Sequence, residues 1–270
     1  SRKYDKVGIA RRQPGSVFKP FTYTAAIDNG YSPYDTLLDS TFTWEDEKAN
    51  ATWSPENYSR ESSGEMLTLS QGLANSKNTI TARLALDLNP NTVATYANRM
   101  GIPRTHVDIK PSTEEKVEGV PSIALGTNNV RLLDMAAAYS TLASGGLYSE
   151  PMAITRVEDK FGNVIWEASQ NPSEALSERT AYTVVDMMRG VIDYGTGARI
   201  RTQFGLGEYD LAGKTGTTDR SADTWFMLMH PDLVSGAWIG FNDQRLTFRT
   251  NFWGQGAHTA LWGAGRHHRG

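Results

Sequence analysis

The stretch from Leu211 to Phe241 decides the fold class, and it reads LAGKTGTTDRSADTWFMLMHPDLVSGAWIGF. Residues 211–218, 224–230 and 233–241 have the length and the apolar or β-branched content of strands, and Pro231-Asp232 supplies a turn between the last two. We therefore predict that this part of the chain forms three strands of an antiparallel sheet.

The segments before this sheet have the apolar spacing of helices. The pattern over residues 16–29 begins after a proline-glycine pair and ends at Gly30. Similar patterns cover residues 66–86, 93–100, 133–142 and 177–191, whereas 31–64 is loop-like and 152–166 has the pattern of a hairpin. We predict an α/β (α+β) fold, an antiparallel central sheet flanked by helices. A helical lobe, residues 21–119, is inserted into a sheet lobe, residues 1–20 and 120–261, with a cleft between them.

Composition excludes several classes of function. The chain of 270 residues has a net charge of −3, so it lacks the basic surplus that neutralises phosphates, and we expect no nucleic-acid partner. It contains no cysteine, which excludes disulfides, thiol nucleophiles and cysteine metal sites. It also has no run of about 18 apolar residues and does not begin with methionine, so we interpret it as an excised fragment.

Three short motifs occur in a fixed order: S-V-F-K at residues 16–19, S-K-N at 76–78 and K-T-G at 214–216. The first motif places the hydroxyl of Ser16 at the predicted start of a helix and returns Lys19 to the same face. This arrangement is typical of a nucleophile beside a base. A lysine acts as a base only when its pKa is lowered, and Lys77 and Lys214 are the cations that we expect to lower it.

The K-T-G motif fits the binding of a peptide end. Gly216 has no Cβ, so we expect it to leave room for a peptide laid along the predicted strand as an added β-strand. The hydroxyls of Thr215 and Thr217, beside Lys214, suit a terminal carboxylate. This motif therefore predicts a subsite for the end of a peptide.

The S-K-N motif supplies a second hydroxyl and an amide. Ser76 suits the relay of a proton to a leaving amine, and Asn78 suits a hydrogen bond with the substrate backbone. Taken singly, a pattern such as S-x-x-K or S-x-N arises about once by chance in a chain this long. K-T-G is rarer, at about 0.05 occurrences. The order and context of the motifs therefore carry the hypothesis of acyl transfer at a peptide C-terminus.

The motifs and their surroundings resemble the transpeptidase domain of class A penicillin-binding proteins. The resemblance includes residues 12–21, 121–126, 143–146, 194–197, 223–226 and 236–241, and it extends over residues 1–261. It implies the fold of the serine β-lactamases and penicillin-binding transpeptidases. It also implies that Ser16 is the acylated nucleophile, Lys19 its base and Ser76 the proton relay. The substrate-binding residues that it implies are Asn78, Lys214, Thr215, Gly216 and Thr217.

The resemblance further implies a reaction and its partners. A peptidoglycan stem peptide ending in D-Ala-D-Ala acylates the serine, D-Ala leaves, and an amine of a neighbouring stem resolves the acyl-enzyme. The N–H groups of Ser16 and Thr217 form the oxyanion hole, and no metal or cofactor takes part. β-Lactam antibiotics acylate the same serine. The implied setting is the periplasmic face of the bacterial inner membrane, with an N-terminal anchor and a glycosyltransferase domain in the full-length protein.

Alternatives remain at this stage. A D,D-carboxypeptidase or a serine β-lactamase shares the acylation step, although we find no convincing E-x-x-x-N pattern of the kind that orients the deacylating water in class A β-lactamases. A non-catalytic β-lactam sensor or a structural domain keeps the pocket without turnover. The two ends also depart from the family pattern. We expect the outer strands of the sheet and the C-terminal helix to be missing, and residues 262–270 to be an atypical tail.

Overall fold

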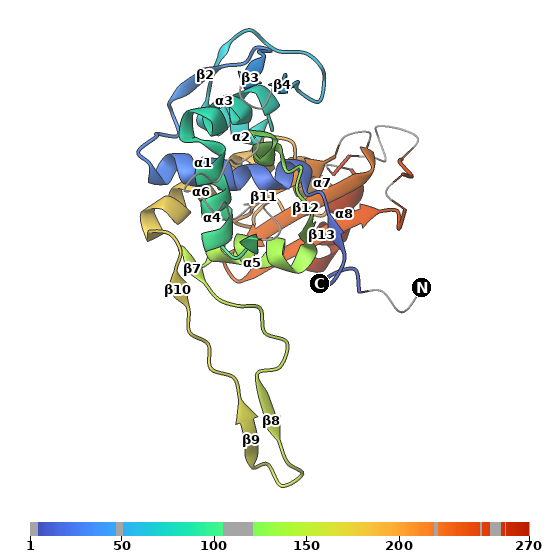
Figure 1. Cartoon of the computed structure of the whole chain (residues 1–270). Coiled ribbons are helices and arrows are strands. Elements are labelled where there is room, and N and C mark those ends of the chain that lie inside the picture. Colours follow the sequence, from blue (N-terminus) through green and yellow to red (C-terminus); the bar gives the residue numbers. More distant parts are fainter. Residues whose placement is uncertain are drawn as a thin grey trace.

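The computed structural model of the chain describes residues 5–46, 51–104, 121–218, 221–243, 245–248, 255–256 and 258–269. Figure 1 shows a body of helices and strands, and a long hairpin arm that points away from that body. The sheet at the C-terminal end consists of β11 (Ala212–Thr217), β12 (Asp223–His230) and β13 (Leu233–Gly240). The strands are antiparallel and lie in the order β11-β12-β13, as the sequence predicts.

The middle strand, β12, is buried on both faces. Trp225, Met227 and Met229 belong to the larger core, with α1, α5 and α6. Phe226 and Leu228 belong to a second, smaller core on the opposite face. Side chains alternate between the two faces of a strand, so a continuous apolar run is what a strand covered on both sides requires.

Helix α8 (Thr259–Arg269) corrects the prediction for the C-terminal end. Residues 262–269 are not an atypical tail, and a C-terminal helix is present. Ala260, Leu261 and Ala264 are buried against the smaller core. Gly263 lowers the helix propensity of this segment, but a Cβ there would come within 2.9 Å of Ala237 Cβ, so the glycine permits close packing of helix on sheet. Burial of one face thus outweighs weak local propensity.

The remaining helices form the rest of the body. Apart from the short helix at residues 199–203, which the sequence did not predict, they lie within or close to the predicted segments. They are α1 (Lys19–Asp28), α2 (Leu69–Ala74), α3 (Asn78–Leu88), α4 (Pro90–Arg99), α5 (Leu132–Ala143), α6 (Glu178–Asp193) and α7 (Arg199–Gln203), with 3₁₀ turns η1 (Gly15–Phe18) and η3 (Pro121–Leu125). Helix α1 is buried over most of its length and contacts α3, α4 and α6. The Ser177 hydroxyl caps α6 by accepting from Thr180 N at 3.2 Å. The predicted lobe boundary at residues 119 and 120 lies outside the described residues.

One predicted helix is interrupted. Residues 66–86 divide into β5 (Met66–Thr68), α2 and the first part of α3, and the break falls at the S-K-N motif. Ser76 has a φ of 54°, in the left-handed region that non-glycine residues seldom adopt. The helical spacing of the apolar residues continues through the motif, so the pattern alone did not reveal the break.

Short strand pairs complete the fold. Most of the predicted loop 31–64 is irregular, but it contains β2 (Thr36–Leu38), which pairs with β5, and the pair β3 (Trp44–Asp46) and β4 (Ala51–Trp53). The other small pairs are β1 (Arg11–Arg12) with β6 (Val130–Arg131) and β7 (Leu147–Tyr148) with β10 (Ser173–Glu174). Among the described residues, none of the helices combines the length and apolar content needed to cross a bilayer.

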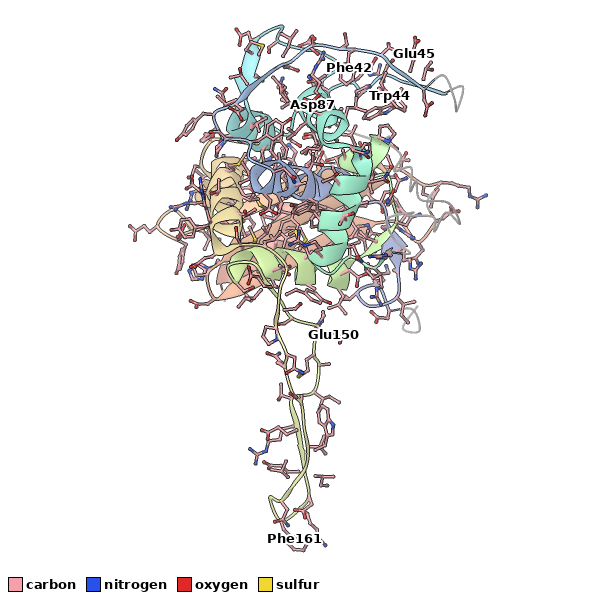
Figure 2. All side chains as sticks on the ribbon, turned by 60° about the vertical axis from the view of Figure 1, so that its left-hand side comes forward. Phe42, Trp44, Glu45, Asp87, Glu150 and Phe161 are labelled. Carbon is pink, nitrogen blue, oxygen red and sulfur yellow. The ribbon has the colours of Figure 1, made fainter. Side chains whose placement is uncertain are left out.

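The arm is the predicted hairpin of β8 (Arg156–Glu158) and β9 (Val164–Glu167). In Figure 2 it extends from the body near Glu150 to its tip at Phe161. Phe161 is 78% exposed and Ile165 is 66% exposed, so the arm adds little to the cores of the body.

Candidate active site

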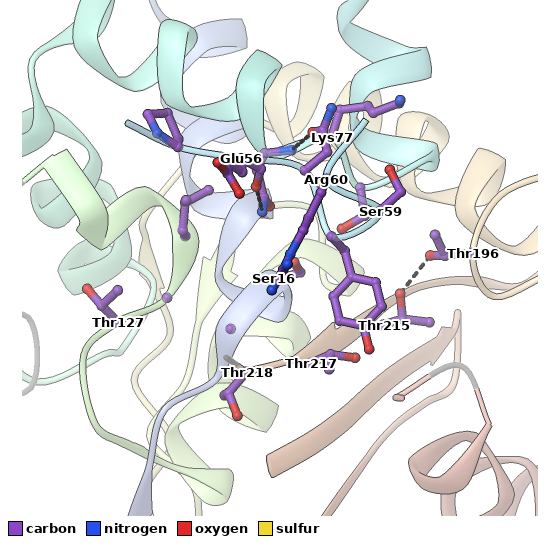
Figure 3. A pocket seen from close by; sticks show the side chains of 18 of the residues that line it. Ser16, Glu56, Ser59, Arg60, Lys77, Thr127, Thr196, Thr215, Thr217 and Thr218 are labelled. Atoms are coloured by element: carbon purple, nitrogen blue, oxygen red, sulfur yellow. Dashed lines mark hydrogen bonds between the residues drawn. The ribbon is translucent and has the colours of Figure 1, made fainter. Parts of the chain in front are cut away.

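The three sequence motifs meet at one open cavity of about 1230 Å³. Figure 3 shows this cavity with Ser16, Lys77, Thr215 and Thr217 around it. Its walls come from the segment before α1, the turn between α2 and α3, strand β11 and the loop from Trp53 to Arg60. Segments far apart in the sequence therefore supply the site, and the expected convergence of the motifs occurs.

Ser16 is presented by η1, directly before α1, so the regular α-helix begins at Lys19 rather than at the serine. Gly15 has a φ of +55°, and a Cβ on it would come within 2.7 Å of the Thr217 carbonyl oxygen. Only glycine fits this left-handed conformation and this close approach to β11 without strain. The backbone of β11 thus lies directly beside the nucleophile candidate.

Gly216 is required for the same contact. A Cβ at this position would come within 2.7 Å of the Pro14 carbonyl oxygen and 2.9 Å of Val17 Cγ1. The missing side chain therefore makes room for the segment that carries Ser16, which differs from the reason expected from the sequence, namely space for a bound peptide. The substrate-binding role of Gly216 stays a prediction.

Lys19 reaches the S-K-N turn from the first residue of α1. Its Nζ donates to the Ser76 carbonyl oxygen at 2.6 Å, to Asn78 Oδ1 at 2.7 Å and to Ser76 Oγ at 3.2 Å. The side chain is fully buried, and no carboxylate of a described residue forms an ion pair with it. Burial, and then the charge of Lys214, hold the pKa of Lys19 well below its usual range, which favours the neutral amine that a base requires.

Lys214 approaches the same turn from β11. Its Nζ donates to Ser76 Oγ at 2.8 Å and to the Thr215 carbonyl oxygen at 3.1 Å. Burial lowers the pKa of Lys214 to about 7. Ser76 Oγ therefore lies between two buried amines, and the two acceptor positions of this hydroxyl match them.

Lys77 departs from its expected role. Its Nζ forms an ion pair with Asp39 at 2.8 Å, away from Lys19. Lys214, and not Lys77, is the cation that lowers the pKa of Lys19. The sequence could not show this, because Asp39 lies in the segment without a regular pattern.

Two threonines of β11, Thr215 and Thr217, line the cavity together with Thr196, a residue that the sequence did not predict for the site. Thr215 Oγ1 lies 2.6 Å from Thr196 Oγ1, and Thr217 Oγ1 accepts from Gly256 N at 3.1 Å. Thr196 lies in the Y-G-T-G stretch at residues 194–197, for which the sequence predicts no role in the site. Ser16 also lines the cavity, and its Oγ makes no hydrogen bond with a described residue.

The loop before the S-K-N motif also forms part of the cavity. Glu56, Tyr58 and Arg60 are among the residues that line it. In Figure 3 the Arg60 side chain extends from this loop over the cavity, toward Ser16 in that view. These positions carry no local motif, and only the folded chain places them at the site.

Comparison with known proteins gives a consistent result at the level of sequence. Residues 5–232 match the family described as the penicillin binding protein transpeptidase domain. The chain is 32% identical to penicillin-binding protein 1A of Neisseria gonorrhoeae over 260 residues, 94% of this chain and 31% of that protein. It is 33% identical to penicillin-binding protein 2D of Bacillus subtilis over 243 residues, 88% of this chain and 33% of that protein. The chain spans about a third of the length of these relatives.

Solved structures show the same fold. Penicillin-binding protein 1A from Haemophilus influenzae has a TM-score of 0.85 at 23% identity, over 98% of this chain and 43% of that one. PonA1 from Mycobacterium tuberculosis in complex with penicillin V has a TM-score of 0.78 at 26% identity, over 98% and 71%. The predicted fold class is confirmed, and the chain belongs to the penicillin-binding protein transpeptidase domain family.

Proposed function

We propose that this chain is a D,D-transpeptidase domain that crosslinks peptidoglycan stem peptides through an acyl-enzyme on Ser16. The observation that carries the proposal is the placement of Ser76 Oγ between the buried amines of Lys19 and Lys214, beside the cavity that contains Ser16. The two N–H groups of a neutral Lys19 are taken by the Ser76 carbonyl oxygen at 2.6 Å and Asn78 Oδ1 at 2.7 Å, so this amine donates to Ser76 Oγ only once it has received a proton. A hydroxyl so placed suits the transfer of a proton to a leaving group.

In the acylation step, Ser16 Oγ attacks the carbonyl carbon of the penultimate D-Ala, and the C–N bond to the terminal D-Ala breaks. The hydroxyl proton of Ser16 goes to neutral Lys19 as an ester forms. A proton returns through Ser76 to the amine of the departing D-Ala, so the enzyme gains and loses one proton. The lowered pKa of Lys19 supports its role as the acceptor.

Strand β11 supports the proposed binding mode. In the described part of the chain it pairs with one strand, β12, and its residues Thr215 and Thr217 line the cavity, so we expect an extended peptide to add along its other edge. The N–H groups of Ser16 and Thr217 are the proposed oxyanion hole, and the close approach of Gly15 to Thr217 fits such a pair. The hydroxyls of Thr215 and Thr217, with Lys214, receive the terminal carboxylate, and Asn78 positions the peptide backbone.

The second half-reaction needs an amine from a neighbouring stem peptide, which attacks the ester and frees Ser16 Oγ. β-Lactams are proposed as inhibitors that acylate the same serine. The expected partner domain is a glycosyltransferase in the full-length protein, which is anchored at the periplasmic face of the inner membrane. The length of the relatives, about three times that of this chain, supports the presence of further domains.

The test is incubation with a synthetic stem pentapeptide and an acceptor amine, followed by measurement of free D-Ala and of the crosslinked product. A transpeptidase releases D-Ala and forms the crosslink in equal amounts. Release of D-Ala without crosslink identifies a carboxypeptidase, rapid turnover of penicillin identifies a β-lactamase, and no acylation identifies a non-catalytic domain. Ser16→Ala must abolish every product, whereas Ser140→Ala, on an exposed part of α5, must not.

A further inference from the structure

We propose that Asp39 and Asn57 are positioning residues for this site, which together hold the S-K-N turn in its active geometry and direct Lys77 away from Lys19. Both residues lie in the irregular segment between α1 and β5, and both are buried. The inference rests on the proposed function, because it assigns to this segment a part in the same acylation step.

Asp39 is the centre of the arrangement. Its fully buried carboxylate accepts from Thr79 Oγ1 at 2.6 Å, Lys77 Nζ at 2.8 Å, Asn57 Nδ2 at 2.8 Å and Ser63 N at 3.0 Å. Burial alone would raise the pKa of Asp39, but these donors outweigh it and hold the pKa below its usual range. The carboxylate is therefore charged, and it fixes Lys77 and Thr79 on either side of Asn78.

Asn57 connects this carboxylate to the start of α3. Its Oδ1 accepts from Asn78 N at 2.9 Å and from Thr79 N at 3.4 Å. These are among the first N–H groups of the helix, which have no partner inside it, and the N-cap residue Lys77 makes no side-chain cap. Asn57 thus caps α3 from a distant segment, in the place of a local capping residue.

The neighbouring Glu56 completes the orientation of the Asn78 side chain. Its carbonyl oxygen accepts from Asn78 Nδ2 at 2.6 Å, while Asn78 Oδ1 accepts from Lys19 Nζ. The amide is held at both ends, so a shift of the 56–57 segment moves the group that binds the base. The segment therefore acts on Lys19 through Asn78.

The conformation of Ser76 requires this support. Left-handed backbone is strained for a non-glycine residue, and such a residue persists only where its surroundings fix it. The residues that follow Ser76 are held by Asp39 and Asn57, which keeps its Oγ between Lys19 and Lys214. Loss of either support should let the turn relax and separate this hydroxyl from one of the two amines.

The test measures the second-order rate of acylation by a fluorescent penicillin, together with the thermal midpoint of each variant. Asp39→Asn keeps the size of the side chain and removes its charge, and the rate should fall between about tenfold and 10²-fold, as for a small displacement of reacting groups. The matched control is Asp134→Asn at the start of α5, a buried carboxylate that pairs with Arg131 at 2.6 Å. It should lower the midpoint and leave the rate unchanged.

A second variant gives a readout that lost stability alone does not produce. Asn57→Asp places two carboxylates in contact. Near pH 8 two charged carboxylates repel each other, so their contact persists only if one of them binds a proton. Among the described residues, Lys77 is the side chain that forms an ion pair with Asp39, and one cation does not neutralise both acids. The rate relative to the parent should therefore be lowest near pH 8 and recover toward pH 5.5. The double variant Asp39→Asn with Asn57→Asp should regain part of the rate at pH 8.

The outcomes separate the two proposals. If the parent chain is not acylated at all, the proposed function fails. If the parent is acylated, and Asp39→Asn and Asn57→Asp react at the parent rate at every pH, the positioning role is overturned. Should Asp39→Asn not fold, Asn57→Ala decides, because it removes the amide and leaves the pair of Asp39 and Lys77 intact. If folded Asn57→Ala is acylated at the parent rate, the inference is likewise overturned.

Discussion

The S-K-N turn and the β8–β9 arm are both tight changes of chain direction, but they are held in opposite ways. At the turn, Ser76 Oγ contacts the amines of Lys19 and Lys214, which lie 57 and 138 positions away from it in the sequence. In the arm, Asp159 binds backbone N–H groups two and four residues further on, and Arg156 pairs with Glu158. The turn is thus a product of tertiary structure and the arm of local sequence, so equal substitutions should have unequal effects on acylation.

The largest difference in acylation rate between the two regions is expected when a lysine is replaced by arginine. Lys19→Arg keeps the charge but removes the base, because a guanidinium stays protonated, so acylation should fall by about 10²–10⁴. Lys160→Arg, in the arm, should change neither acylation nor stability, since this lysine is exposed and lies over the Phe161 ring. Stopped-flow acylation by a fluorescent penicillin measures both. An unchanged rate in Lys19→Arg would show that Lys19 acts only through its charge.

Glycine to alanine gives a second matched pair. Gly15 and Gly162 both have positive φ, at +55° and +85°, so each alanine variant should lose about 1–2 kcal/mol of unfolding free energy from backbone strain. A Cβ at Gly15 also meets the Thr217 carbonyl oxygen at 2.7 Å, whereas one at Gly162 meets nothing within 4 Å. Acylation should therefore fall only in Gly15→Ala, by up to about 10²-fold. Equal acylation in the two variants would mean that the close approach to β11 is not needed.

The smallest effect expected is a shift in pH dependence. The charge of Lys214 contributes to the lowered pKa of Lys19, after burial. Acylation requires neutral Lys19, so its rate rises as the pH passes upward through that pKa. In Lys214→Ala the pKa of Lys19 should rise, and the acid limb of the rate profile should move to higher pH, alongside a lower maximum rate. A limb that stays in place, measured from pH 5 to 9, would show that the two amines do not interact.

The same contrast explains what the sequence could predict. The arm, the three strands and most helices follow from local patterns, since turn residues and apolar periods are themselves local. The meeting of Ser16, Ser76 and Lys214 was expected from the order of the motifs and the resemblance. The sequence did not predict the ion pair of Lys77 with Asp39, nor the contributions of Asn57 and Thr196 to the site. These contacts arise where distant segments pack together. Helix α8 was missed because Gly263, which permits its close packing on the sheet, has a low helix propensity when the segment is considered alone.

The most direct test of the account is mass spectrometry of the intact chain after incubation with a penicillin, followed by peptide mapping. We predict one adduct of the mass of the antibiotic on the peptide that contains Ser16, and none in Ser16→Ala. Absence of an adduct, or an adduct on a different residue of the parent chain, would contradict the assignment of Ser16 as the nucleophile.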